Sequence, residues 1–168
     1  CAGSVTPWNT YLGGEEYEPD ASKIEKDPTA DGNYNDKVRS YWLGDYDKSS
    51  PYHNGWITEV DIKHSNEPQF VKHYAMGRFS HELGYVMPDA KTAYLTDDGT
   101  NDTLFMFVAD KQADLSSGTL YAAIWRQTSG FGGGSAQLDW INLGHADNQQ
   151  IKQVIKQGIS FSEMFMEY

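Results

Sequence analysis

The chain has 168 residues, which is long enough for one domain with a hydrophobic core. Its 24 acidic and 13 basic side chains give a formal net charge of -11, which opposes binding to nucleic acid or anionic lipid and suits a protein that collects divalent cations. The mean hydropathy is -0.64, and no apolar run approaches the roughly 20 residues that a membrane-spanning helix requires.

The start of the chain combines a lone cysteine with a pair of carboxylates. Cys1 is the only cysteine, and a turn-forming Thr6-Pro7-Trp8 segment separates it from Glu15 and Glu16. A soft thiolate and hard carboxylates in one segment favour a metal site, because sulfur selects iron, zinc or copper whereas clustered oxygens suit calcium or magnesium. The alternative is an inert buried cysteine beside solvent-facing glutamates.

Cys1 has a second interpretation, since a bacterial lipoprotein begins its mature chain with an acylated cysteine. The residues that follow, including Val5, Trp8 and Leu12, look suited to packing rather than to a flexible tether. No basic, then apolar, then small-residue segment opens the sequence, as expected for a mature or trimmed chain or for one without a leader. One cysteine cannot form an internal disulfide, so the cysteine count does not indicate whether the protein works in an oxidising or a reducing compartment.

Residues 17–54 are acidic, polar and rich in turn-forming residues, and they predict a long surface loop. Within it, Asp27, Asp31 and Gly32 partly match a calcium-binding loop. Val38, however, stands where the closing glutamate of such a loop should be. A solvated loop is therefore the favoured interpretation.

The middle of the chain predicts antiparallel strands. Residues 55–62 alternate as in a half-buried strand, with Trp56 and Val60 on one face and Ile57 and Glu59 on the other. Further strands are expected at 82–86, 92–96, 104–109, 119–125 and 137–143.

Turn residues join these strands into hairpins. Met87-Pro88-Asp89-Ala90 connects the strands at 82–86 and 92–96, and residues 97–101 connect the next pair. The glycine-rich stretch 130–135 lacks the lysine of a phosphate loop and is interpreted as a linker.

The last part of the chain, 147–168, predicts one or two short helices. Ile151, Val154 and Ile155 fall at helical spacing, and Gly158 ends the pattern. Ser160 is expected to cap a second short helix that runs through Phe165. Short strands followed by a helix only at the end indicate a mainly β fold.

Three motifs in this order resemble the PhoX family of bacterial alkaline phosphatases. They are the lone Cys1 with the acidic pair after it, Gly77-Arg78-Phe79-Ser80-His81-Glu82, and Tyr94-Leu95-Thr96-Asp97-Asp98, with Gly118-Thr119-Leu120-Tyr121 behind them. The resemblance implies a β-propeller with a metal cluster on its central axis. A chain of this length is then a single domain or a fragment, with two or three blades. Its open sheet edges predict a homodimer or exchanged segments.

The resemblance also implies a site with iron and calcium. Cys1 matches the iron-binding thiolate, and Glu16, Glu82 and Asp98, or its neighbour Asp97, match the acidic ligands. His81 and Glu82 should point to opposite faces of a strand, so Glu82 is the expected ligand. Arg78 is a candidate for binding phosphate, with a structural role as the alternative.

The implied function is metal-dependent hydrolysis of small phosphate monoesters in the periplasm or outside a bacterial cell. Family members carry a further downstream motif of an arginine, a proline and an acidic pair that is not found before Tyr168. We therefore expect this chain to have little or no activity, and whether it acts as an enzyme stays open. Two alternatives remain: a secreted, non-enzymatic β-module with structural calcium sites, and a lipid-anchored surface protein.

Overall fold

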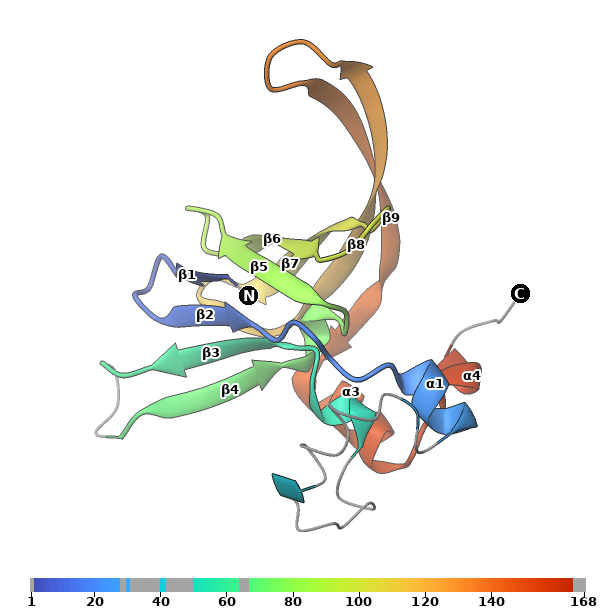
Figure 1. The fold of residues 1–168 in the computed structure, drawn as a ribbon. Coiled ribbons are helices and arrows are strands. Elements are labelled where there is room, and N and C mark those ends of the chain that lie inside the picture. The colour runs from blue at the N-terminus through green and yellow to red at the C-terminus, as the bar shows by residue number, and fades with distance from the viewer. Residues whose placement is uncertain (1, 28–29, 31–39, 42–49, 64–66, 165–168) are drawn as a thin grey trace.

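The protein is built from two antiparallel sheets with short helices at one end (Figure 1). The computed structural model describes residues 2–27, 30, 40–41, 50–63 and 67–164. The first sheet has the order β1-β2-β3-β4 and the second has the order β5-β6-β7-β8-β9. The mainly β fold with short C-terminal helices that the sequence predicts is confirmed.

The first sheet joins the start of the chain to its middle. Its strands are β1 (Gly3–Val5), β2 (Tyr11–Gly14), β3 (Ile57–Asp61) and β4 (Gln69–His73). The predicted strand at 55–62 is therefore β3. Its buried face carries Ile57, which is fully buried, and Glu59, which lies in a polar network described below.

The second sheet is a meander in which each strand pairs with the next. Its strands are β5 (His81–Val86), β6 (Thr92–Asp97), β7 (Leu104–Lys111), β8 (Asp114–Ser129) and β9 (Ser135–Asp147). All the hairpins expected from 82 to 143 are present. The last two strands extend well beyond the predicted segments 119–125 and 137–143.

The short helical segments gather at one end of the sheets (Figure 1). They are α1 (Ala21–Lys26), η2 (Pro51–His53), η3 (Tyr74–Met76), α3 (Asn148–Lys156) and α4 (Phe161–Met164). Helix α1 lies in the stretch that the sequence predicts to be a loop. It forms because the side chain of Asp20 caps its first turn by accepting a hydrogen bond from the Lys23 amide, and because Ala21 is buried.

The second of the two C-terminal helices begins after Ser160, the residue that the sequence predicts as its cap, and Ser160 hydrogen-bonds Glu163 there. Asp147 caps α3 in a capping box with Gln150, which sequence analysis did not predict. Phe165, the expected end of the second helix, lies outside the described residues. No helix in the described ranges is both long and apolar enough to cross a membrane.

The hydrophobic core lies where the two sheets meet. Its fully buried side chains include Leu12 and Ile57 from the first sheet, and Leu95 and Phe107 from the second. Gly84 of β5 allows this contact, because a Cβ there would lie 2.8 Å from Cδ1 of Ile57. The packing brings the ends of β1 and β2 against β5, and that junction carries the candidate site.

Candidate metal centre

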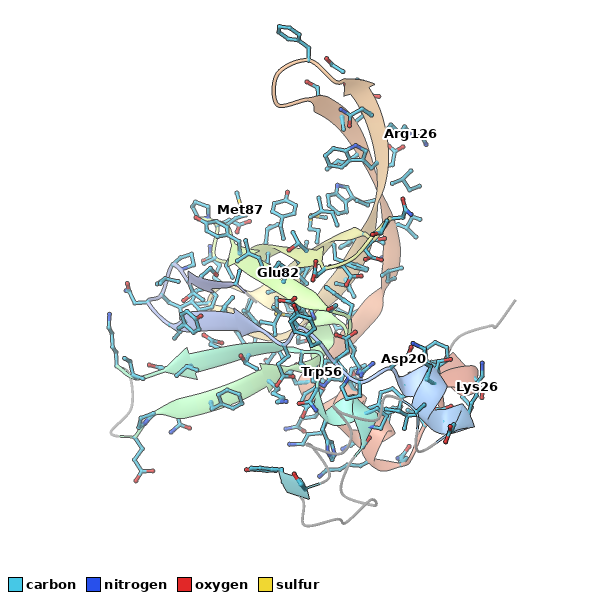
Figure 2. The ribbon with its side chains drawn as sticks, viewed as in Figure 1. Asp20, Lys26, Trp56, Glu82, Met87 and Arg126 are labelled. Carbon is cyan, nitrogen blue, oxygen red and sulfur yellow. The ribbon has the colours of Figure 1, made fainter. Side chains whose placement is uncertain are left out.

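Three carboxylates from separate segments meet at the junction of the sheets. Glu16 follows β2, Glu82 belongs to β5, and Asp98 follows β6, and one oxygen of each lies within 4.8 Å of the others. Figure 2 shows Glu82 near the middle of the molecule, between the two sheets. Glu16 and Glu82 are half-buried and Asp98 is exposed, so the cluster can be reached from solvent.

Glu82 reaches the cluster through a break in the strand pairing. His81 pairs with Asp97 and Leu83 pairs with Thr96, which leaves Glu82 as the extra residue of a β-bulge. A bulge bends its strand and re-aims a side chain. His81, the preceding residue, turns the other way and is fully buried. The structure thus brings Glu82 to the cluster and buries His81, and the role of Glu82 as a ligand stays a prediction.

Glu16 reaches the cluster because the backbones of β2 and β5 lie close together. A Cβ at Gly14 would lie only 2.1 Å from the carbonyl oxygen of His81, so β2 can approach β5 this closely only with glycine there. The amide of Ala2 donates to the carbonyl of Glu82 at 2.8 Å and fixes the same junction. Sequence analysis missed this role of Gly14, although two glycines directly before two glutamates were a visible signal.

The side chains of Glu15 and Glu16 make different contacts. Glu15 accepts a hydrogen bond from the amide of Trp56 and forms an ion pair with Lys72 at 2.6 Å. The next residue after the pair, Tyr17, has a φ of 63°, a left-handed conformation that is uncommon for an aromatic residue. A hydrogen bond with Glu16 raises the pKa of the Tyr17 phenol, so Tyr17 contacts the cluster from outside.

The side chains of Asp97 and Asp98 also make different contacts. The amide of Asp98 donates to the carbonyl of Ser80 at 2.9 Å, and its side chain joins the cluster. The carboxylate of Asp97 instead accepts from the amide of Ser80 at 3.1 Å. Burial, together with the charge of Asp102, raises the pKa of Asp97 to about 6. Of the two acids offered by the sequence, the structure brings Asp98 to Glu16 and Glu82.

The negative charges of the cluster affect the pKa of its carboxylates. A hydrogen bond with Glu16 and the charge of Glu16 raise the pKa of Asp98 above its ordinary value. A bound cation would relieve this repulsion. The three donors are carboxylate oxygens, which are the ligands that calcium and other hard cations prefer. The residues therefore fit a calcium ion.

Comparison with known proteins agrees with the motifs at this site. The profile of the family described as Alkaline phosphatase PhoX matches residues 1–165. The chain belongs to the PhoX family. It is also similar to the solved structure of Pseudomonas fluorescens PhoX in complex with vanadate, a transition state analogue, at 25% sequence identity and a TM-score of 0.56. No curated protein sequence matches the chain.

The match spans only part of the Pseudomonas fluorescens chain. The structural match covers 99% of this chain and 32% of the Pseudomonas fluorescens chain, so this chain spans about a third of its relative. Cys1, the predicted iron ligand of this PhoX chain, lies outside the described residues. Its role as a ligand stays a prediction.

Arg78 of the PhoX chain is held by backbone carbonyls. Its Nε donates to the carbonyl of Asn54 at 2.8 Å, and its Nη2 donates to those of Pro19 and Pro51 at 2.8 and 2.9 Å. Its guanidinium also lies over the ring of Tyr52, 5.2 Å from the centroid. These contacts favour the structural alternative, in which Arg78 ties three loops together. Phosphate binding by Arg78 stays a prediction.

Proposed function

We propose that Glu16, Glu82 and Asp98 hold a calcium ion of a PhoX-type phosphatase site. The observation that carries this proposal is the meeting of three carboxylate oxygens within 4.8 Å in a member of the PhoX family. The intact site would act on small phosphate monoesters. A cation bound there would neutralise charge on a phosphate ester and polarise its oxygens.

The protein's own contribution is to position the three acids. The bulge at Glu82 and the close approach of Gly14 to His81 hold the three carboxylates together, and Glu16 raises the pKa of Asp98 there. Such a preformed site lowers the ordering cost of binding. Arg78, with three donors on carbonyls, stabilises the loops beside it rather than the ester itself.

Cys1 is the proposed ligand of an iron ion, because a thiolate selects iron over calcium. The family resemblance supports a mixed site, and the described residues supply its oxygen donors. Calcium takes six to eight oxygens. Three carboxylates leave the remaining positions to water or to other groups, and we expect this chain to hydrolyse phosphate esters weakly or not at all.

The same family resemblance supports two broader proposals. The two sheets would be blades of a β-propeller, and the protein would work in the periplasm or outside a bacterial cell. Cell fractionation of the native host tests the second proposal. Recovery of the protein in the cytoplasm would contradict it.

Calorimetry with Ca²⁺ tests the cation site directly. We expect a dissociation constant on the order of 10⁻⁴ to 10⁻³ M and at least tenfold weaker binding by Glu82→Gln or Asp98→Asn. Glu67→Gln is the matched control, since it removes one exposed charge outside the cluster and should bind Ca²⁺ like the wild type. Equal binding by all of these proteins would refute the site.

A non-enzymatic module with a structural calcium site is the second candidate. It is favoured by one observation, that the candidate ligands in the described ranges are all oxygen donors. Iron binding separates the two functions, because a structural calcium site has no use for a thiolate. A thiolate-to-iron charge-transfer band on addition of iron, lost in Cys1→Ala, supports the phosphatase site, whereas calcium binding without iron binding supports the structural role.

A further inference from the structure

The last hairpin extends beyond the sheet to which it belongs. The final pair between β7 and β8 is Phe105 with Ala122, and the part of the β8–β9 hairpin from this pair to its tip, residues 122–141, is called the arm here. In Figure 1 the arm rises away from both sheets, and Figure 2 shows Arg126 far out along it. A two-stranded hairpin without a further layer is only marginally stable in water.

The arm exposes large apolar side chains. Trp125 is 59% exposed, Ile141 is 49% exposed, and Phe131 at the tip is 93% exposed. Trp125 pairs with Leu138 on one face, while Ile124 and Ile141 lie on the other face. Both faces of the arm therefore carry apolar surface that association would remove from water.

Within the described residues, no strand pairs with the outer edge of β9. β9 is the last strand of its sheet, and its 13 residues include neither a lysine nor a proline, the residues that commonly guard an exposed edge. A second strand could therefore pair with β9.

The charge of the chain indicates what kind of partner fits. Residues 115–146 hold one arginine and one aspartate, Arg126 and Asp139, which form an ion pair at 2.9 Å. This long segment is neutral in a chain of net charge -11. A basic partner would be attracted to the acidic remainder rather than to the arm. Two copies of the chain repel each other through their net charge, and this neutral surface adds nothing to that repulsion.

We propose that a second copy of this chain docks on the arm, with β9 of one copy antiparallel to β9 of the other. Such a pair has two-fold symmetry, so each copy covers the same surface of its partner and the assembly closes at two chains. The apolar side chains of both arms are then shared between two chains. This inference does not depend on the cation site.

Sedimentation equilibrium across about 1 to 100 µM protein tests the proposal, because dimerisation depends on concentration. We expect a mass that approaches twice the chain's 18.9 kDa. Ile141→Lys should weaken association at least tenfold. Phe70→Lys is the matched control, since Phe70 is 62% exposed on β4, the edge strand of the other sheet, and it should leave association unchanged. Added salt should tighten the dimer by screening the net charge.

Hydrogen exchange on the same samples locates the contact. The amides of β9 should gain protection as the protein concentration rises, and those of β4 should not. A strict monomer, open-ended larger assemblies, or a dimer that Ile141→Lys leaves intact would each overturn the proposal. A monomer with an unprotected arm would instead point to a different occupant, such as a further segment of a longer PhoX chain.

Discussion

Gly14 of β2 lies directly against the carbonyl of His81 in β5, so closely that a Cβ at Gly14 would be 2.1 Å from that oxygen. This contact joins the two sheets and sets Glu16 beside Glu82. The geometry of the carboxylate cluster therefore depends on a residue that binds nothing itself.

Gly14→Ala should separate the two strands. We expect a loss of about 1 to 3 kcal/mol in the free energy of unfolding, as for other overpacked sites, and at least tenfold weaker Ca²⁺ binding. Gly13→Ala is the control, because a Cβ there would meet only side-chain atoms, the nearest at 3.3 Å. Urea unfolding and calorimetry of both variants check this. Wild-type Ca²⁺ affinity in Gly14→Ala would show that the approach does not position the site.

Glu59 anchors a second polar network, away from the cluster. Its carboxylate accepts hydrogen bonds from Trp8 at 2.8 Å and from Thr10, and pairs with His73 at 2.7 Å. Burial alone would raise the pKa of Glu59, but the hydrogen bonds from His73, Thr10 and Trp8 outweigh it and lower the pKa. His73 also contacts Asn148, so the network ties α3 to the first sheet.

Glu59→Leu should leave these buried donors without an acceptor. We expect a loss of about 2 to 4 kcal/mol in the free energy of unfolding. Asp139→Leu removes an exposed partner of Arg126 and should change it by less than about 1 kcal/mol. Chemical denaturation measures both. Equal effects of the two substitutions would argue against a stabilising role for the Glu59 network.

His81 should make stability depend on pH. Burial lowers the pKa of His81 to about 4, although a hydrogen bond to the Gly77 carbonyl opposes this. The unfolded chain therefore binds a proton before the folded protein does. Stability is complete above about pH 6.5 and falls as the pH drops from 6.5 towards 4, by on the order of 3 kcal/mol.

Thermal unfolding across this pH range checks the His81 prediction. His81→Gln should flatten the dependence, since glutamine does not titrate. His145→Gln, at an exposed position outside the core, is the control and should change the dependence much less than His81→Gln does. A wild-type pH profile in His81→Gln would show that other groups cause it.

Arg78→Lys tests whether this arginine holds loops or binds phosphate. Lysine cannot reproduce a planar fork that donates to three carbonyls. We expect a loss of about 1 to 3 kcal/mol in the free energy of unfolding, whereas Arg126→Lys on the exposed arm should have little effect. Unchanged stability of Arg78→Lys, together with lost binding of vanadate by calorimetry, would favour the phosphate role.

Much of the fold could be predicted from local patterns. The hairpin from His81 to Asp97 follows from alternating residues around Pro88 and Asp89, and the start of α4 follows from Ser160. The missed elements are short or depend on contacts far along the chain. The strand Gly3–Val5 has three residues, and helix α1 has one buried residue.

The candidate site, like the fold, could be predicted only in part. The motifs supplied Glu16, Glu82 and Asp98 as candidate ligands, and the alternation of a strand separated Glu82 from His81. The bulge at Glu82 and the contact of Gly14 with His81 could not be predicted, because each depends on how distant strands pair. A buried glutamate such as Glu59 also cannot be told from an exposed one until its partners Trp8 and His73 are placed.

A cation shared by Glu16, Glu82 and Asp98 can be located by anomalous scattering from crystals grown with Tb³⁺, a substitute for Ca²⁺. We expect one strong peak among the three carboxylates, at about 2.3 to 2.6 Å from their oxygens, and its loss in Glu82→Gln. A saturated crystal with its peaks elsewhere, and with none at this cluster, would show that these residues do not share a cation.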